Sequence, residues 1–194
     1  MRAMIFDTET TGMVLRDRPP ADPGQPDLVQ LGILLVETDD WLPRARHSML
    51  VKLPPGASIE AGAREAHGIS EADCEHYGVP LAVAVSLFNQ LCLQSDLIVA
   101  HNLAFDRSIM QTALFRLGGK PDRMEGVRGL RTMLASTELL KIPGRMGDYK
   151  WPSLAEAYRH FAGKELEGAH DALVDTEACL AVFRGLVDEG AVRL

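Results

Sequence analysis

Five residues in three short segments have the types and spacing to do chemistry. They are Asp7 and Glu9 in IFDTETTG, Asp106 in HNLAFD, and His170 and Asp175 in GAHDALVD. Each of the four acids stands where the surrounding apolar pattern predicts a buried surface. Buried carboxylates lose hydration and repel one another, so they need cations to remain ionised. Together they predict a divalent-metal site that serves phosphoryl chemistry.

The first segment ends a predicted central strand, residues 1–8. Side chains alternate along a strand, so Ile5, Asp7 and Glu9 share one face, and the carboxylates emerge where the apolar run stops. Ligands of α/β sheets commonly bind beyond the carboxyl ends of strands, and two acids at this spacing can hold one hard cation. Taken alone, the same residues followed by Gly12 could also form an ordinary turn.

Asp106 and Asp175 each head the apolar stripe of a predicted helix and therefore point toward the core. Asp106 could instead serve only the helix dipole, with Asn102 as the N-cap. His170 precedes Asp175 by five positions, about 140° around an ideal helix. It must therefore lie at or before the helix start, where it is a candidate general base.

The elements that must position these residues follow from periodicity and turn residues. We expect strands at 1–8, 28–38, 48–53, 97–100 and 127–132, and helices at 59–67, 70–76, 80–93, 103–117, 133–140, 153–161 and 171–187. This order predicts a single α/β domain over residues 1–194, with a central mixed five-stranded sheet flanked by helices. Residues 12–26, with four prolines, should form a long surface loop.

Composition limits the class of protein. Of the 194 residues, 46% are hydrophobic and 24% charged, which suits one domain with a sizeable core. No apolar run is long enough to cross a membrane, and the first residues turn acidic too early for a signal peptide. The cysteines lack metal-site spacing and indicate reduced thiols in a cytoplasmic protein: Cys74, Cys92 and Cys179.

The net charge of −7 argues against nucleic acid as a partner, but its distribution does not. The stretch from Arg116 to Lys150 holds eight basic and four acidic residues, so it carries +4 and the rest of the chain −11. A cation-binding acid cluster beside a basic stretch suits an enzyme that handles phosphates. The alternative is a merely solvated basic region.

The three segments, in order, strongly resemble the three exonuclease motifs of the DnaQ-like superfamily, in its DEDDh branch. AHGIS at residues 66–70 is similar to that family's HGI element, and the resemblance runs from about Met4 to Leu186. EGAHDALVDTEA, preceded by KWPSLAEAY, is most similar to the epsilon-like members, the proofreading subunits of bacterial DNA polymerase III. His170 stands at the family's histidine position, so the branch with tyrosine there is disfavoured.

The resemblance implies a ribonuclease H-like fold and two-metal hydrolysis of a 3′-terminal phosphodiester. Asp7, Glu9 and Asp175 would hold one cation, Asp7 would bridge to the second, and Asp106 would support the second directly or through water. His170 would deprotonate the attacking water, and the product would be a nucleoside 5′-monophosphate. Two Mg²⁺ or Mn²⁺ ions suit an all-oxygen site, whereas zinc prefers nitrogen or sulfur ligands.

The resemblance also implies contacts with the substrate. Thr10, Thr11 and Gly12 would form the floor under the terminal nucleotide, where a backbone N–H after Glu9 can meet the 3′-hydroxyl. His67 could contact that nucleotide or its phosphate, or could instead stabilise a turn.

Polar and aromatic residues of two later segments could complete the substrate site. His101 and Asn102 follow a buried strand as polar groups at its carboxyl end. Phe105 could stack on a base or belong to the core. Trp151 presents the same alternatives, and we expect it in the core.

The favoured function is a metal-dependent 3′–5′ exonuclease acting on single-stranded DNA or frayed 3′ ends. An enzyme acting on RNA or short oligonucleotides is the alternative within the class. A haloacid-dehalogenase-like phosphatase would need an aspartate where Glu9 stands, and a catalytically silent nucleic-acid-binding or scaffold module would not need all five site residues.

The family's epsilon members carry a tail that tethers them to the polymerase, whereas this chain ends at Leu194 without a clear clamp-binding motif. We therefore expect a free-standing nuclease. A polymerase or clamp partner and the oligomeric state are left open by the sequence.

Overall fold

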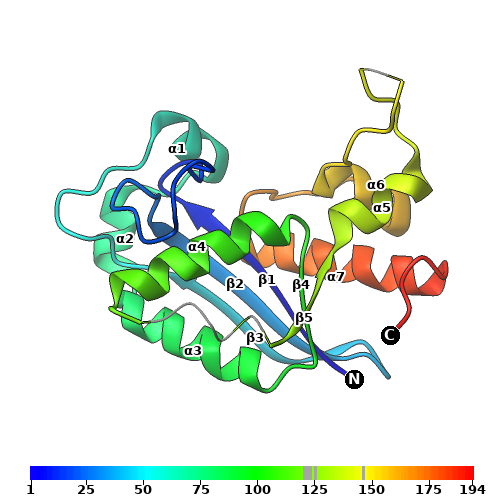
Figure 1. The fold of residues 1–194 in the computed structure, drawn as a ribbon, viewed down its shortest axis with the longest axis horizontal. Coiled ribbons are helices and arrows are strands. Elements are labelled where there is room, and N and C mark those ends of the chain that lie inside the picture. The colour runs from blue at the N-terminus through cyan, green and yellow to red at the C-terminus, as the bar shows by residue number, and fades with distance from the viewer. Residues whose placement is uncertain (120–123, 125, 146) are drawn as a thin grey trace.

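The computed structural model describes residues 1–119, 124, 126–145 and 147–194. A five-stranded sheet lies at its centre with helices on both faces (Figure 1), as predicted. In chain order the elements are β1 (Arg2–Thr10), β2 (Leu28–Glu37), β3 (Leu42–Leu50), α1 (Ala61–His67), α2 (Glu71–Tyr77), α3 (Leu81–Leu93), β4 (Leu97–Ala100), α4 (Leu103–Arg116), β5 (Arg128–Arg131), α5 (Thr132–Leu140), α6 (Leu154–Ala162) and α7 (Ala172–Asp188).

The sheet, in the order β3–β2–β1–β4–β5, mixes both kinds of pairing. β2 lies antiparallel between β1 and β3, whereas β4 and β5 continue from β1 in parallel. β1 is the central strand, and both of its faces are covered. Its continuous buried run from Ala3 to Phe6 follows from that position.

The two faces of the sheet have separate cores. On one face Met4 and Phe6 pack under α3 and α4, where the ring of Phe6 meets that of Phe88 edge-on at 5.0 Å. On the other face Ile5 packs under α7 with Phe183. Because side chains alternate along β1, the next residues on the Ile5 face are Asp7 and Glu9.

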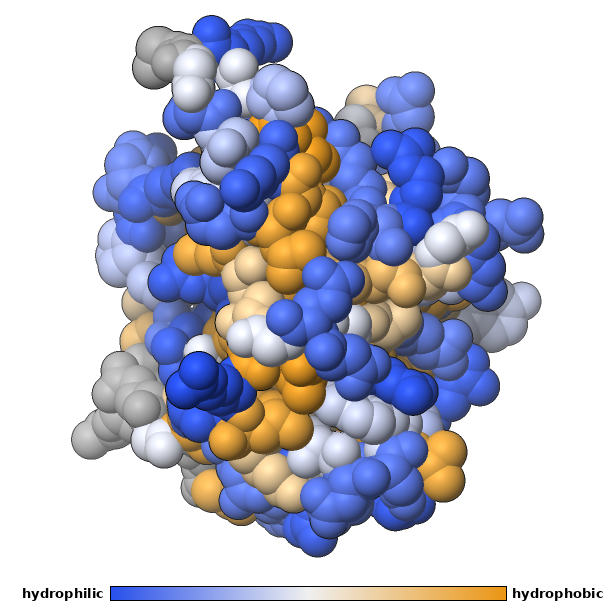
Figure 2. All heavy atoms as spheres, turned by 90° about the vertical axis from the view of Figure 1, so that its right-hand side faces the viewer, coloured by the Kyte–Doolittle hydropathy of each residue, from blue (hydrophilic) through white to orange (hydrophobic). Residues whose placement is uncertain are grey.

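Helices α5 and α6 add a smaller apolar cluster against the end of α7. Figure 2 shows apolar side chains gathered in a band on this side of the molecule. All three cysteines are free and buried, in agreement with the prediction of reduced thiols. Within the described ranges, every helix falls short of the length and apolar character that crossing a membrane requires.

β1 and β4 pair only from Ala3 to Ile5, whereas β1 stays paired with β2 as far as Thr10. Beyond Ile5, the edge of β1 that faces β4 is therefore open to other partners. The acidic residues of β1 lie in this open part of the strand. The end of the β1–β4 ladder thus creates the space for a site at the carboxyl end of the sheet.

The expected strand at 48–53 is wrong, because β3 begins at Leu42 and ends at Leu50. Val51 makes only an isolated bridge, to Val79. β3 is an edge strand whose residues are exposed or half-buried, so charged side chains interrupt its apolar alternation. Pro43 is tolerated there beside a register irregularity. The other expected elements agree with the structure within two residues at each end.

The first residues of α7 lie directly on β2. A Cβ added at Gly32 would stand 2.2 Å from the carbonyl oxygen of Ala172. Gln30 accepts a hydrogen bond from the N–H of Ala172 at 3.1 Å and donates one to Asp171 at 3.0 Å. Gly32 pairs with Asp7 in the β1–β2 ladder, so this contact sets the position of α7 beside the acids.

Gly32→Ala should lower the free energy of unfolding by about 1–3 kcal/mol, the usual cost of overpacking, because the backbone of α7 must move. Urea denaturation measures the change. Gly62→Ala in α1 is the matched control, since a Cβ there meets nothing within 4 Å. Equal stability of the two variants would show that Gly32 does not seat α7.

Candidate active site

The structure brings the five predicted catalytic residues together at one pocket of about 210 Å³. β1 contributes two of the acids, α4 a third, and the start of α7 the fourth together with the histidine. We call this hollow the acid pocket. It is lined by Asp7, Thr8, Glu9, His101, Asn102, Phe105, Asp106, Leu154, His170 and Asp175.

Asp106, in the first turn of α4, is buried and fixed by the open edge of β1. Its Oδ1 accepts hydrogen bonds from the backbone N–H of Thr8 at 3.1 Å and from the Thr8 hydroxyl at 2.8 Å. These bonds favour the ionised carboxylate, but burial outweighs them and raises the pKa of Asp106 from 3.8 to about 7.

Asp175 and His170 approach each other through the backbone. His170 precedes the first residue of α7, as its spacing predicts, and has a left-handed φ of 67°. Its N–H donates to Asp175 Oδ2 at 3.1 Å, while its side chain stays exposed. A left-handed conformation is unfavourable for a non-glycine residue. The turn therefore holds the imidazole at the rim of the acid pocket, outside the helix.

The carboxylates raise one another's pKa. Burial is the largest cause for Glu9, whose pKa rises from 4.5 to about 8, with Asp175 and Asp106 as further causes. The pKa of Asp7 is raised well above its usual value by burial and by the charges of Asp106 and Asp175. Burial also raises the pKa of Asp175, although the N–H of His170 offsets part of the effect.

This donor set fits divalent cations. Glu9, His170 and Asp175 each offer a ligand atom within 4.8 Å of the other two. Oδ1 of Asp175 is buried and has no hydrogen-bond partner among the described residues. A buried polar atom without a partner is costly, and a cation on the carboxylates would satisfy it and relieve their repulsion. The structure thus supports a candidate metal centre.

The predicted floor, Thr10 to Gly12, is held firmly beside Glu9. The N–H of Thr11 donates to the carbonyl of Asp27 at 3.0 Å, so that donor is not available to a substrate. The hydroxyl of Thr10 donates to the carbonyl of Gly12 at 2.7 Å. A Cβ at Gly12 would meet the carboxyl group of Glu60 at 2.5 Å, which shows how closely α1 approaches this segment.

His67 uses both ring nitrogens within the chain. Nδ1 accepts from the N–H of Ile69 at 3.0 Å, and Nε2 lies 3.2 Å from the carbonyl oxygen of Thr10. Burial lowers the pKa of His67, so the ring favours the neutral form. These contacts give His67 the turn-stabilising position that the sequence left as one of two alternatives, at the edge of the floor.

His101 is buried in the wall of the acid pocket. Its Nε2 donates to the carbonyl of Pro152 at 3.0 Å, so Nδ1 accepts from the Thr132 hydroxyl at 2.9 Å. The Thr132 oxygen in turn lies 3.6 Å from the Cys179 sulfur. Burial lowers the pKa of His101 and keeps it neutral. His101 thus links the end of β4 to α5 and to the segment before α6.

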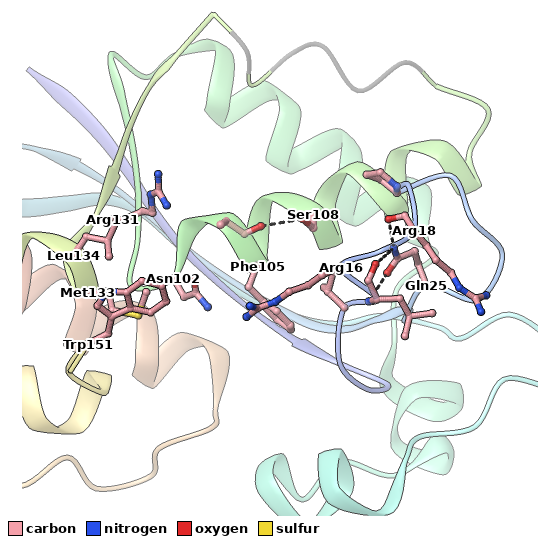
Figure 3. Close-up of a pocket in the computed structure, with 14 residues that line it drawn as sticks. Arg16, Arg18, Gln25, Asn102, Phe105, Ser108, Arg131, Met133, Leu134 and Trp151 are labelled. Atoms are coloured by element: carbon pink, nitrogen blue, oxygen red, sulfur yellow. Dashed lines mark hydrogen bonds between the residues drawn. The ribbon is translucent and has the colours of Figure 1, made fainter. Parts of the chain in front are cut away.

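Asn102 and Phe105 each contribute to the lining of two adjacent hollows. They line the acid pocket and also a neighbouring groove of about 360 Å³ (Figure 3). Trp151 lines that groove and is 61% exposed, so the expectation that it belongs to the core is wrong. Trp151 lies outside the helices and strands, between β5–α5 and α6, and apolar periodicity gives no information on the burial of such a position.

The basic stretch is only partly available to a ligand. Arg116 pairs with Asp27, and Lys150 with Glu156. Four exposed basic residues of the stretch form no ion pair with another described residue: Arg128, Arg131, Lys141 and Arg145. The expectations for Lys120 and Arg123, and for the acids Asp122 and Glu125, fall outside the described residues.

Sequence reasoning missed the polar residues that seat α7. Asp171 caps the helix by accepting from the N–H groups of Leu173 and Val174, and it also raises the pKa of Glu9. Gln30 joins Asp171 to β2. The signal was present, because Gln30 is the one polar side chain inside the run LVQLGILLV, and an internal polar residue in a buried strand needs a partner.

The raised pKa values predict how stability depends on pH. A carboxyl with a higher pKa in the folded state binds more protons when folded. The free energy of unfolding of the metal-free protein should therefore fall as pH rises from 4.5 to about 8, the interval set by Glu9. Saturating Mg²⁺ or Mn²⁺ should cancel this fall, because a cation binds the ionised form.

Thermal melts in EDTA and in Mg²⁺ across this interval provide the measurement. Asp106→Asn should flatten the metal-free profile, whereas Glu65→Gln, at an exposed position of α1, should leave it unchanged. A metal-free profile of Asp106→Asn identical to that of the wild type would contradict the electrostatic account.

Comparisons with known proteins identify relatives. A family model of exonucleases, RNase_T, matches residues 4–183. The chain is also 26% identical over 176 residues to DNA polymerase III subunit epsilon of Buchnera aphidicola subsp. Acyrthosiphon pisum (strain APS), covering 90% of this chain and 68% of the relative.

Structures of E. coli exonuclease I have the same fold. The complex with a dT13 oligonucleotide has a TM-score of 0.75 at 16% identity and covers 94% of this chain and 40% of that one. A product-bound structure gives the same TM-score and identity over 97% of this chain and 43% of the other. The chain thus spans less than half the length of these neighbours, and the expected ribonuclease H-like fold is confirmed. With the family model matched from residue 4 to 183, the chain belongs to the RNase_T exonuclease family, in agreement with its DnaQ-like motifs.

Proposed function

We propose that the chain is a metal-dependent 3′–5′ exonuclease of the DEDDh type, with residues 1–194 acting as one exonuclease domain. It removes the terminal nucleotide from single-stranded DNA or frayed 3′ ends and releases nucleoside 5′-monophosphates. The meeting of Asp7, Glu9, Asp106 and Asp175 in one hollow, with His170 at its rim, carries the proposal. Family membership supports it, as do the names of the epsilon subunit and exonuclease I.

The acids would hold two cations, Mg²⁺ or Mn²⁺. Glu9 and Asp175 lie close enough to share one ion. Asp7 is assigned as the shared ligand because it lines the same pocket as Asp106 and Asp175. Asp106, held by Thr8, would serve the second ion. When bound, the two ions would stabilise charge on the attacking and leaving oxygens of the phosphodiester.

His170 is assigned as the general base. Its imidazole stays in solvent at the rim, where it can take a proton from water and release it to bulk. Its backbone N–H fixes the residue to Asp175, so the ring is tied to the metal-binding helix. The buried His101 of the wall and the half-buried His67 beside the floor already use both ring nitrogens and are not assigned this role.

Asp7→Asn should lower kcat by about 10³-fold or more, because several kcal/mol of charge stabilisation depend on the cations. Release of mononucleotides from an oligonucleotide gives the rate, and circular dichroism confirms the fold. Glu65→Gln is the charge-matched control and should keep wild-type turnover. Turnover by Asp7→Asn at the wild-type rate would contradict the metal assignment.

His170→Ala should slow turnover by about 10²–10⁴-fold, the usual contribution of a positioned base. With saturating Mg²⁺, the pH dependence of kcat should also change in the variant, because the group that accepts the proton has been removed. His76→Ala, at an exposed site on α2, is the control. If the pH–rate profile of His170→Ala matched the wild-type profile, another group would be the base.

The natural polymer is tested with 5′-labelled single-stranded DNA and RNA of equal sequence, each with Mg²⁺, Mn²⁺ or EDTA. A metal-dependent ladder that shortens from the 3′ end, faster on DNA, is expected. Faster digestion of RNA would replace the DNA preference by the exoribonuclease alternative. Absence of metal-dependent shortening of either polymer would contradict the proposal.

A further inference from the structure

We infer that the groove beside the acid pocket binds the nucleotides that precede the terminal one in an unpaired strand, with Trp151 as a stacking surface and Arg16 and Arg131 as phosphate contacts. This inference rests on the proposed function and deepens it. We call the hollow, of about 360 Å³, the Arg16–Trp151 groove. This volume lies within the range typical of ligand-binding clefts in proteins.

The groove has a wall, a floor and an end that come from different parts of the chain (Figure 3). The loop after β1 provides the wall with Arg16 and Arg18, and α4 provides the floor with Phe105. Trp151 lies at the opposite end, next to Met133 of α5. Figure 3 shows Arg16 extending from the loop toward the middle of the groove. The groove is therefore elongated along α4, which suits a strand better than a compact ligand.

Continuity with the acid pocket indicates which part of the substrate enters the groove. Asn102 and Phe105 line both hollows. Hydrolysis at the acids would break the bond between the terminal phosphate and the O3′ of the preceding nucleotide. The preceding nucleotide must therefore lie in a space connected to the acid pocket. The Arg16–Trp151 groove is such a space, and the next phosphates of the strand would follow it.

The chemistry of the groove matches single-stranded nucleic acid. Trp151 is 61% exposed, and apolar side chains continue beside it. Arg16 and Arg131 are exposed, and neither forms an ion pair with another described residue. Proteins bind unpaired strands by stacking bases on aromatic rings and by placing cations along the backbone. The groove offers both within one hollow.

The loop that carries Arg16 is held rigidly. Buried Gln25 accepts from the N–H of Leu15 at 3.0 Å and donates to the carbonyls of Leu15 at 2.9 Å and Arg18 at 3.0 Å. From α4, Arg116 donates to the carbonyl of Gln25 at 2.8 Å and to Asp27 at 3.2 Å. A wall fixed before binding loses less entropy when the strand arrives. Gln25 is therefore a positioning residue for Arg16.

The test compares kcat/KM for a dinucleotide and a tetranucleotide, in DNA and RNA form, with saturating Mg²⁺. For the wild type, kcat/KM should be much higher for the tetranucleotide than for the dinucleotide. Trp151→Ala and Arg16→Ala should each reduce that gain about tenfold or more, the scale of base stacking on an aromatic ring. Trp151→Phe should keep most of it. Gln25→Ala should behave like Arg16→Ala, with its fold checked by a thermal melt.

Tyr77→Ala is the matched control, because this tyrosine of α2 is 76% exposed and does not line the groove. A wild type that gains nothing from length, or an undiminished gain in Trp151→Ala and Arg16→Ala, would overturn the groove assignment while leaving the exonuclease proposal standing.

A binding measurement separates the two proposals. The chain has two tryptophans, and Trp41 packs edge-on against Phe183 in the core at 5.1 Å. In an Asp7→Asn background, in which degradation of the probe should be slowed about 10³-fold or more, oligothymidylate and oligouridylate should quench the fluorescence of Trp151. The signal should vanish in the added Trp151→Phe variant. Quenching by a chain that never hydrolyses either polymer would uphold the groove and refute the proposed reaction.

Discussion

The burial of four carboxylates beside one another, reinforced by their repulsion, is the constraint on which the rest of the site depends. Asp106 and Asp175 lie in the first turns of α4 and α7, where the helix N-terminus stabilises a negative charge by about 0.3–1 kcal/mol. One pKa unit already corresponds to about 1.4 kcal/mol, and the pKa of Glu9 rises from 4.5 to about 8. Helix ends therefore cannot hold all four groups ionised at neutral pH. Cations can, so these carboxylates form a candidate metal centre before any substrate arrives.

The sheet brings the four carboxylates together. β1 leaves β4 after Ile5 but stays on β2, so one edge of the strand is open where the acids begin. Thr8 uses that edge to hold Asp106, and Gly32 on β2 lets α7 approach closely enough to bring in Asp175. The acids are thus positioned by backbone contacts of the core, which is a stiffer support than a loop.

Two hollows of opposite character adjoin at Asn102 and Phe105. One is acidic and suits cations, whereas the other combines an exposed tryptophan with arginines. With the proposed groove, this separation would reconcile a net charge of −7 with a nucleic-acid substrate, because local charge and not the total would face the strand. In that proposal the proline-containing loop, held by Gln25 and Arg116, forms a fixed wall of the groove.

Local sequence patterns were enough to predict the family, the α/β class, most element boundaries and the five candidate catalytic residues that meet in the acid pocket. These follow from local periodicity and ordered motifs; the five-residue spacing alone placed His170 before α7. Features that local patterns cannot encode became visible only in the packed fold. Charged side chains on the edge strand β3 interrupt its apolar pattern, so the start of the strand was predicted too late in the sequence. Trp151 was expected in the core but is exposed. The partners of Gln30 and His101 come from segments remote in the chain. Periodicity reports which side of an element is covered, whereas the identity of the covering group depends on how distant segments pack.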